Sequence, residues 1–296
     1  VPPPTEVIDA LPPDAECAAT LRRFPKLRAR ARVEDAILPR GSRRMTSQKM
    51  FAEIASLGLR AASANDLRAI PAADIMAKGD PSTFSGGGPI IDGKIISISV
   101  VEAFKTGKAA QVPYMVGYNS AEFPSRPEEV HASLTRTLGA KTADLPALVA
   151  TYPDKEDMAA RIMGDIIFGE PARYLAGLHA ASQQQTFLYR FDVVSTSVRH
   201  RLKGTTHAQE RQYVFDTLKT SPYATDENDK VQAQYAVTYW TNFARTGDPN
   251  GAGVPNWPRY STATDQLLEF TNDGPVGKAS PHKTRWDAIA ARYPGP

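Results

Sequence analysis

Three short apolar segments, separated by long stretches of helical pattern, constrain the fold of this chain most strongly. They cover residues 112–118, residues 186–194 and the neighbourhood of residues 267–270. Each is rich in residues that favour strands and is short enough to be a buried strand. Residues 127–183 are mostly helical by pattern, and a helix is expected over residues 229–245. Buried strands alternating with helices predict an α/β fold.

Composition fits one large globular domain, or most of one. The chain has 296 residues, of which 42% are hydrophobic and 23% charged, an ordinary mixture for a globular protein. Lys and Arg total 35 against 32 for Asp and Glu, a net charge of +3. So small a charge on so long a surface does not by itself attract a polyanion. We therefore expect no nucleic-acid partner.

Cysteine content and hydropathy limit the cellular context. Cys17 is the single cysteine, so an intrachain disulfide framework is excluded. No apolar run reaches the roughly 18 to 20 residues needed to cross a bilayer, and the Pro-rich start has no signal-peptide core. The chain begins with Val, which is compatible with removal of a leader. We expect a soluble protein without a membrane partner, either cytoplasmic or exported with its leader removed.

The first 45 residues differ in character from the rest. Prolines open the chain, and basic residues crowd residues 22–44. Such a run can bind phosphates, and nucleic-acid binding would then weaken steeply with salt. Phe24 is its only aromatic residue, however, so it lacks a stacking platform. We interpret residues 1–45 as an atypical, solvated segment and residues 46–296 as the packed region.

Further elements are expected near the start of the packed region. A helix is predicted over residues 47–61, and a second short helix is entered at Ser63 or Asn65, with Pro71 starting or interrupting a further turn. Residues 84–96 contain three consecutive glycines and an Asp-Gly turn, which is typical of a loop and hairpin.

Among the five histidines, His207 has the most favourable position for catalysis. It follows the strand at residues 186–194 through a polar loop, and α/β sheets place their sites outside the carboxyl ends of the strands. His200 lies in the same loop between Arg199 and Arg201, where a solvated role is expected. The other three lie in helical or terminal contexts without a partner motif, and they are His131, His179 and His282.

Glu122 is the carboxylate that follows a predicted strand most directly. A histidine base needs a carboxylate to hold its tautomer and to stabilise the imidazolium. Acidic residues after strands are common, and a lone histidine is often structural. Position alone therefore leaves open whether Glu122 and His207 form a catalytic pair.

Three motifs, in order along the chain, resemble those of the type-B carboxylesterase family, which includes cholinesterases and bacterial para-nitrobenzyl esterases. The matching residues are Gly117, Asn119 and Glu122 in the first; His207, Glu210, Tyr213, Val214 and Phe215 in the second; and Trp240, Phe243, Gly247, Asp248, Pro249, Asn250, Trp257 and Pro258 in the third. Weaker likeness extends the resemblance over roughly residues 46–290.

The resemblance implies an α/β-hydrolase fold, of which this chain holds the C-terminal portion of the central sheet with its flanking helices. It implies a serine carboxylesterase activity on a small-molecule carboxylic ester, with no cofactor or metal. Glu122 and His207 would be the acid and base of a catalytic triad, and Glu210 would fix the histidine loop. The aromatic residues of the third motif are expected to be core or loop anchors.

The nucleophile of such enzymes lies in a Gly-x-Ser-x-Gly turn, and the 296 residues contain no such sequence. Ser85 has Thr83 two positions before it and follows no apolar strand, so it is a poor candidate, and Gly86–Gly88 poorly imitates the oxyanion loop of the family. We expect the serine to come from an N-terminal half or a partner chain.

Other interpretations remain open. The chain could derive from a truncated gene, could have lost catalysis, or could have become an esterase that uses another serine. It could also be a non-catalytic cholinesterase-like binding or interaction module. Loss of the acid or the histidine would favour that module, and both residues are retained. Without the strands of the missing half, the chain alone is expected to have poor stability.

Overall fold

A computed structural model describes residues 64–78, 91, 95–138 and 146–291. The chain divides into two compact units, Val1–Val100 and Val101–Pro296. The predicted segment at residues 1–45, the helix predicted after it, and most of the predicted hairpin lie outside the described residues. Ser85 and Gly86–Gly88 also lie outside them.

Two short helices lie in the described part of the first unit. They are α5, Ala64–Ala69, and α6, Ala72–Lys78. Pro71 lies between them, and its ring removes the backbone N–H that a continuous helix would need. The Asp74 N–H then donates to the Pro71 carbonyl at 3.0 Å. The prediction that Pro71 starts or interrupts a further turn agrees with its position directly before α6.

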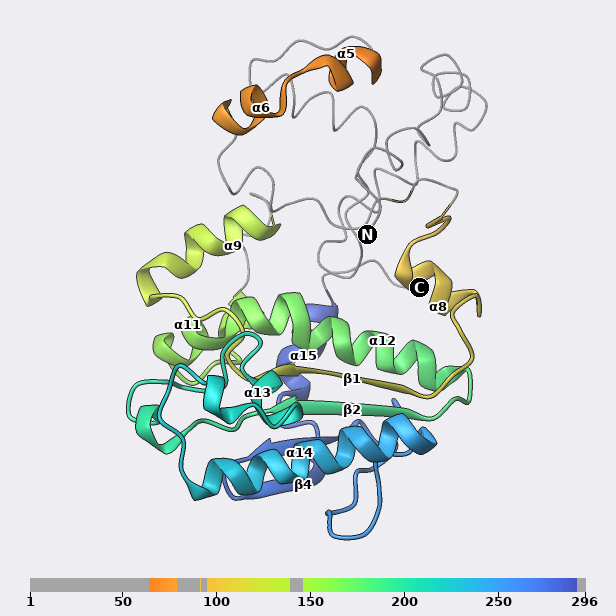
Figure 1. Cartoon of the computed structure of the whole chain (residues 1–296), viewed down its shortest axis with the longest axis vertical. Coiled ribbons are helices and arrows are strands. Elements are labelled where there is room, and N and C mark those ends of the chain that lie inside the picture. The colour runs from red at the N-terminus through yellow and green to blue at the C-terminus, as the bar shows by residue number, and fades with distance from the viewer. Residues whose placement is uncertain (1–63, 79–90, 92–94, 139–145, 292–296) are drawn as a thin grey trace. The chain divides into compact units, whose positions relative to one another are not determined.

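A four-stranded sheet organises the second unit (Figure 1). Its strands are β1, Tyr114–Asn119; β2, Thr186–Phe191; β3, Gln266–Thr271; and β4, Gly274–Ala279, in the spatial order β1-β2-β3-β4. The first three are parallel, and β4 returns antiparallel to β3. The three predicted strands are confirmed. Sequence reasoning missed β4, because it contains three small or glycine residues and no run of apolar ones.

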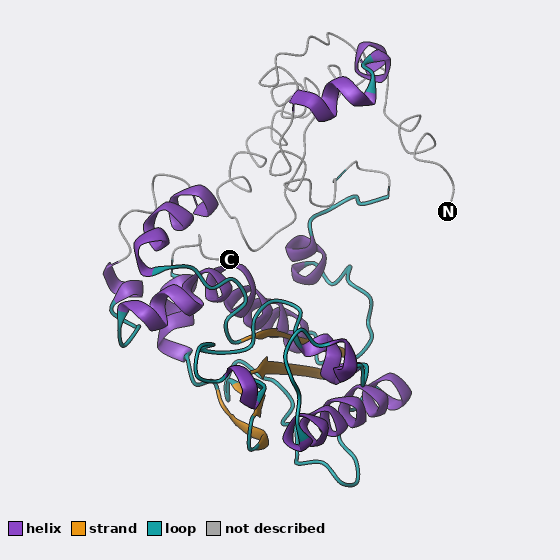
Figure 2. Cartoon of the chain, turned by 60° about the vertical axis from the view of Figure 1, so that its left-hand side comes forward, coloured by secondary structure: helices purple, strands orange, loops and turns teal. Residues whose placement is uncertain are grey.

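Helices connect the strands. They are α8, Val100–Lys105; η1, Pro127–Glu129; α9, Val130–Leu138; α10, Pro146–Val149; α11, Lys155–Gly164; the π-helical segment η3, Asp165–Gly169; α12, Glu170–Ala181; η4, Thr196–Val198; α13, Glu210–Val214; η5, Leu218–Thr220; α14, Glu227–Thr246; and α15, Lys283–Ala290. Helices lie on both faces of the sheet, with α12 on one face and α14 on the other (Figures 1 and 2). No helix among the described residues is long and apolar enough to cross a membrane.

Strand periodicity divides the core between the two faces. Successive side chains of a strand point to opposite faces of the sheet. In β2, Leu188 joins the cluster that packs with α11, α12 and α15, whereas Phe187 joins the cluster that packs with α14. In β3, Leu267 and Leu268 divide in the same way. Both faces of the central strands are therefore buried, which explains why their sequences are nearly continuous apolar runs.

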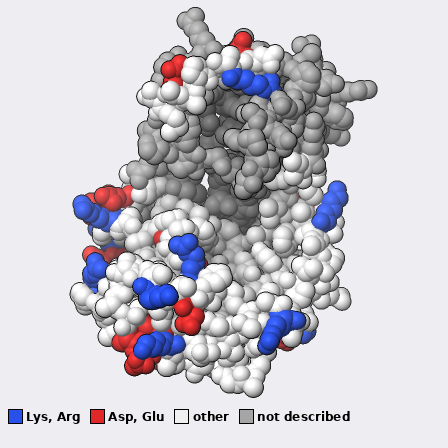
Figure 3. Space-filling model, viewed as in Figure 1, with Lys and Arg blue, Asp and Glu red and all other residues white. Residues whose placement is uncertain are grey.

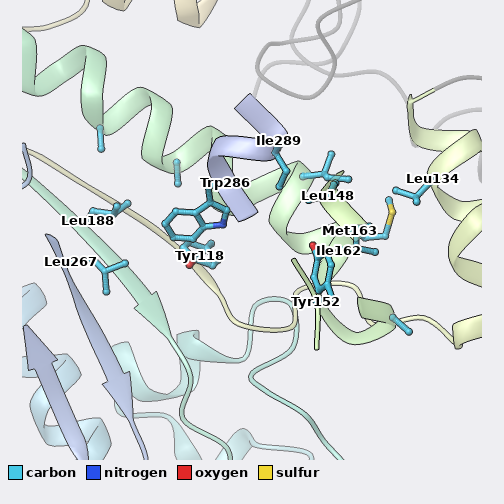
Figure 4. Packing of buried hydrophobic residues seen from close by; sticks show 14 of the residues in the cluster. Tyr118, Leu134, Leu148, Tyr152, Ile162, Met163, Leu188, Leu267, Trp286 and Ile289 are labelled. Carbon is cyan, nitrogen blue, oxygen red and sulfur yellow. The ribbon is translucent and has the colours of Figure 1, made fainter. Parts of the chain in front are cut away.

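Trp286 of α15 lies at the centre of the first cluster (Figure 4). It is fully buried, and its ring meets Tyr118 of β1 edge to face at 5.3 Å. On the opposite face, Trp257 is buried against Tyr239 of α14, and its indole N–H donates to the Leu188 carbonyl at 3.0 Å. The expectation that Trp257 is a core residue is confirmed.

Helix α14 has a distinct signal at each end. Asp226 accepts from the backbone N–H of Asp229, and the Asp229 side chain accepts from the backbone N–H of Asp226, which forms a capping box. Gly247 ends the helix with φ of +76°, a conformation that glycine adopts without steric cost. Asn250 then accepts from the Trp257 N–H at 2.7 Å, so the predicted turn at residues 247–250 anchors the core tryptophan.

Candidate functional site

The candidate site lies where β1 and β2 end. The two strands are parallel and in register from Tyr114 opposite Thr186 to Asn119 opposite Phe191. Their carboxyl ends therefore meet at one edge of the sheet, where α/β folds place their sites. The segment after β1 carries Glu122, and the longer loop after β2 carries His207. We call these segments the acid loop, residues 120–123, and the histidine loop, residues 192–209.

Glu122 and His207 are directly hydrogen-bonded. Glu122 Oε2 lies 2.6 Å from His207 Nδ1. The carboxylate side chain is 6% exposed, whereas the imidazole is 49% exposed. An ionised Glu122 can only accept, so it fixes the proton of a neutral imidazole on Nδ1. The lone pair of that imidazole is then on Nε2, the nitrogen that a base would use.

Two backbone contacts hold Glu122 in place. Its Oε1 accepts from the Asn119 N–H at 2.8 Å, and its own carbonyl accepts from the His207 N–H at 3.0 Å. Burial raises the pKa of Glu122 because it penalises the charged form. The hydrogen bonds from Asn119 and His207 stabilise the carboxylate and lower its pKa, which partly offsets the effect of burial.

Asn119 also holds the histidine loop. Its side-chain Nδ2 donates to the Thr206 carbonyl at 3.1 Å and to Glu210 Oε2. The sequence resemblance predicts that Glu210 fixes the histidine loop. In the structure it accepts a hydrogen bond from Asn119, which in turn bonds the loop. Ala208 directly follows His207 with φ of +61°, an uncommon left-handed conformation for a residue with a side chain. These contacts turn the loop sharply at the histidine.

Small residues allow the two loops to lie close to their supports. A Cβ on Gly164, at the end of α11, would lie 3.0 Å from Glu122 Cβ. A Cβ on Gly204 would lie 2.3 Å from Ser120 Oγ. Ser120 Oγ donates to Asp192 and accepts from the Thr205 N–H at 2.9 Å. The acid loop is therefore packed tightly between α11 and the histidine loop.

Two phenylalanines lie against the imidazole. The ring centroid of His207 is 4.6 Å from that of Phe123 and 5.4 Å from that of Phe168. Phe123 is 41% exposed, and Phe168 lies in the π-helical segment η3, a type of segment that is frequent at functional sites. Sequence reasoning singled out neither residue, because Phe168 is distant in sequence and a single phenylalanine in a helix carries no signal.

The remaining histidines have other environments. His200 is exposed on the histidine loop, as predicted. His179 is buried, and its two ring nitrogens lie 2.7 Å from Thr186 Oγ1 and 3.1 Å from the Val112 carbonyl. Burial lowers the pKa of His179. Among the described residues, no group of three or more His, Cys, Asp and Glu side chains is placed to hold a metal ion.

Part of this region is similar in sequence to a known protein family. Residues 146–287, which include His207 and α14, match the model of the carboxylesterase family. Glu122 lies before the matched residues, and its pairing with His207 rests on the geometry given above.

Relatives with curated descriptions are carboxylesterases and a lipase. Bile salt-activated lipase of Bos taurus is 29% identical and the match covers 62% of this chain and 36% of the relative. Carboxylesterase 1C of Rattus norvegicus is 28% identical over 58% of this chain and 36% of the relative. The chain therefore spans about a third of the length of these carboxylesterase-family relatives.

Solved structures show that the fold is the predicted α/β-hydrolase fold. A PNB esterase superposes with a TM-score of 0.65 at 21% identity, covering 84% of this chain and 56% of that structure. EstA of Aspergillus niger superposes equally well at 20% identity, covering 86% of this chain and 57% of that structure. The sheet with helices on both faces corresponds to about half of each esterase structure.

Proposed function

We propose that this chain supplies the acid and base of a serine carboxylesterase, with Glu122 and His207 as two members of its catalytic triad. The observation that carries the proposal is the 2.6 Å hydrogen bond from His207 Nδ1 to the buried Glu122 Oε2. In such a triad the carboxylate orients the imidazole and stabilises the imidazolium. The match of the region around His207 to the carboxylesterase family model supports the same activity class.

Each residue has a defined step in the proposed reaction. His207 Nε2 takes the proton from a serine hydroxyl as its oxygen attacks the ester carbonyl carbon. The resulting imidazolium is stabilised by Glu122 and then gives its proton to the departing alkoxide, which leaves an acyl-serine. Water, deprotonated by the same nitrogen, attacks the acyl carbon; His207 then returns that proton to the departing serine oxygen as the acid is released. The substrate class is a small, uncharged carboxylic ester.

The proposed nucleophile comes from outside these 296 residues. The printed sequence has no Gly-x-Ser-x-Gly turn. The serines of the two loops also have other partners: Ser120 Oγ donates to Asp192, Ser195 Oγ lies 3.2 Å from the Tyr213 hydroxyl, and Ser197 Oγ donates to the Ala224 carbonyl at 2.7 Å. We therefore propose that an N-terminal half or a partner chain contributes the serine and the oxyanion hole.

The alternative is a non-catalytic cholinesterase-like binding module. Such a module needs no acid-base pair, so its residues at these positions would be free to change. The retained Glu122 and His207, together with the supporting Asn119 to Glu210 contact, favour the catalytic proposal.

The proposal is tested in two steps. First, the purified chain alone is treated with a fluorophosphonate probe, which labels activated serines, and is assayed with para-nitrophenyl butyrate. Neither labelling nor His207-dependent hydrolysis is expected. A labelled serine in the isolated chain would overturn the proposal of an external nucleophile.

Second, the chain is co-produced with the serine-bearing N-terminal region of a PNB esterase, and the co-purified assembly is assayed with the same ester. Hydrolysis is expected to fall on the order of 10⁴-fold when the orienting carboxylate is neutralised by Glu122→Gln, and at least as far with His207→Gln. His200→Gln is the matched control, because this histidine is exposed on the same loop. An active assembly in which His207→Gln keeps full rate would contradict the assigned roles.

A further inference from the structure

We propose that Arg161 is a positioning residue that joins the acid loop to the histidine loop through hydrogen bonds. This inference rests on the proposed function, because it concerns the geometry of Glu122 and His207. Arg161 lies in α11. It contacts neither member of the pair and acts through the backbone of both loops.

One guanidinium bonds both loops at once. Arg161 Nη1 donates to the Ser120 carbonyl at 2.9 Å, and Nη2 donates to the Lys203 carbonyl at 2.6 Å. Ser120 lies two residues before Glu122, and Lys203 lies four residues before His207. The two loops are thus joined by a single side chain from a third element.

The guanidinium is itself anchored. Arg161 Nε donates to Asp157 Oδ1 at 2.6 Å, and the Arg161 side chain is 14% exposed. Asp157 Oδ2 lies 3.3 Å from Arg285, which also pairs with the buried Asp165 at 3.1 Å. Charge-assisted hydrogen bonds are stronger than neutral ones. The Arg161 guanidinium is therefore held by a largely buried ionic cluster.

Few backbone hydrogen bonds pair the two loops, so the Arg161 bonds are expected to contribute to their alignment. Beyond the ends of β1 and β2, the Ala121 N–H donates to the Thr205 carbonyl at 2.9 Å, and the His207 N–H donates to the Glu122 carbonyl at 3.0 Å. These two bonds are supplemented by side-chain bonds from Ser120 to Asp192 and Thr205 and from Asn119 to the Thr206 carbonyl. Arg161 bonds the loops at the start of this pairing.

Lysine does not reproduce this arrangement. Arginine presents several N–H donors in a rigid planar fork, whereas the lysine ammonium is a single point charge on a flexible stem. The three Arg161 bonds go to acceptors from three different segments. Arg161→Lys therefore keeps the charge beside Asp157 while removing the fork that spans both carbonyls.

The test is amide hydrogen exchange of the full chain, followed by NMR at the N–H groups of Ala121, Thr205 and His207. Arg161→Met is expected to speed their exchange about tenfold, since one charge-assisted hydrogen bond has about that weight in an equilibrium. Amides of the central strands, such as Leu268, are expected to keep their protection. The downfield Nδ1 proton of His207, recorded after ¹⁵N-histidine labelling, is expected to broaden through faster exchange with water.

Arg173→Met is the matched control. Arg173 lies in α12, is 16% exposed and bonds Asp265 and Asp287, which belong to neither loop, so its loss is expected to leave the three loop amides unchanged. Faster exchange in both variants, or equal protection in Arg161→Met and the native chain, would overturn the proposal. If the three loop amides of Arg161→Lys exchange as slowly as in the native chain, the planar guanidinium is not required, and only the positive charge of residue 161 contributes.

The NMR readout separates this inference from the proposed function. If the native chain gives a protected Nδ1 proton and Arg161→Met leaves it unchanged, the positioning role of Arg161 is overturned. The hydrogen bond between Glu122 and His207 is then still supported. If the native chain gives no protected Nδ1 proton, the pair itself is not formed, and both proposals are overturned.

Discussion

Glu122 and His207 are 85 positions apart in the sequence, and their side chains meet at 2.6 Å. The contact exists because β1 and β2 are parallel neighbours whose carboxyl ends reach the same edge of the sheet. A buried carboxylate beside a half-exposed imidazole leaves one ring nitrogen directed away from the carboxylate. The pair thus combines a fixed orientation with access to a reacting group.

Glu122→Gln is expected to change how stability depends on pH. The folded chain raises the pKa of Glu122 above 4.5, chiefly through burial. Between 4.5 and the folded pKa, the native state binds more protons than the unfolded state, so the contribution of Glu122 to stability is present at low pH and is lost as pH rises. Urea unfolding between pH 4 and 7 should show a smaller loss in Glu122→Gln than in the native chain.

The exposed Glu128→Gln is the control for this measurement, because Glu128 lies on the surface of η1. Its pH profile should follow that of the native chain. Identical profiles for Glu122→Gln and the native chain would show that the Glu122 carboxyl titrates alike in both states.

Gly117→Ala is expected to destabilise the sheet by about 1–3 kcal/mol, the usual cost of overpacking a core. A Cβ at Gly117 would lie 2.3 Å from the ring of Tyr189 on the neighbouring strand, and the two residues are directly opposite in register. The double variant with Tyr189→Val should recover part of the loss, which a double-mutant cycle of urea midpoints measures. Absence of any coupling between the two sites would contradict the close packing.

Arg190→Met is expected to cost about 1–3 kcal/mol, because it removes a buried cation from Glu269, which keeps only Lys278 at 2.8 Å among the described cations, and from the partly exposed Asp192. Arg190 Nη1 bonds Glu269 at 2.6 Å and Asp192 at 2.7 Å, and its side chain is 4% exposed. Lys230→Ala breaks the exposed pair with Glu227 and should cause no measurable loss. The measurement is urea unfolding at one pH, and a similar midpoint for both variants would be inconsistent with the buried network.

His282→Gln is expected to make the chain less sensitive to acid. Burial, reinforced by the charges of Arg190, Arg285 and Arg161, lowers the pKa of His282 from 6.5 to about 3. Between these values the unfolded state binds the additional proton, so the contribution of His282 to stability is present above pH 6.5 and is lost as pH falls towards 3. Thermal unfolding at pH 4 and pH 7 should show a smaller difference in His282→Gln than in the native chain. Equal differences would indicate an exposed, freely protonated imidazole.

Charges of both signs are mixed on the visible face of the second unit (Figure 3). On the face shown in Figure 3, basic and acidic side chains lie interspersed over the second unit rather than gathered by sign. The basic residues at 22–44 lie outside the described residues, so the interpretation of that segment stays a prediction.

Much of the fold was predictable because it depends on local pattern. The run at residues 186–194 contains the buried strand β2, as its composition indicates. The run at residues 112–118 leads into β1, which lies at the edge of the sheet and is partly buried until Tyr118. The helix predicted over residues 229–245 is α14, which has a capping box at its start and Gly247 after its end. In contrast, β4 and α15 were missed, since the short β4 is held by pairing with β3 and α15 by burial of Trp286.

The sequence by itself determined the α/β class, the candidate pair Glu122 and His207, and the motifs of the carboxylesterase family, because each depends on residue type, order and short-range spacing. Only the tertiary structure decided that the two side chains bond, and that Arg161 and Phe168 lie at the site. Those contacts join segments that are distant along the chain. Their partners are chosen by strand order and helix packing, which no local pattern encodes.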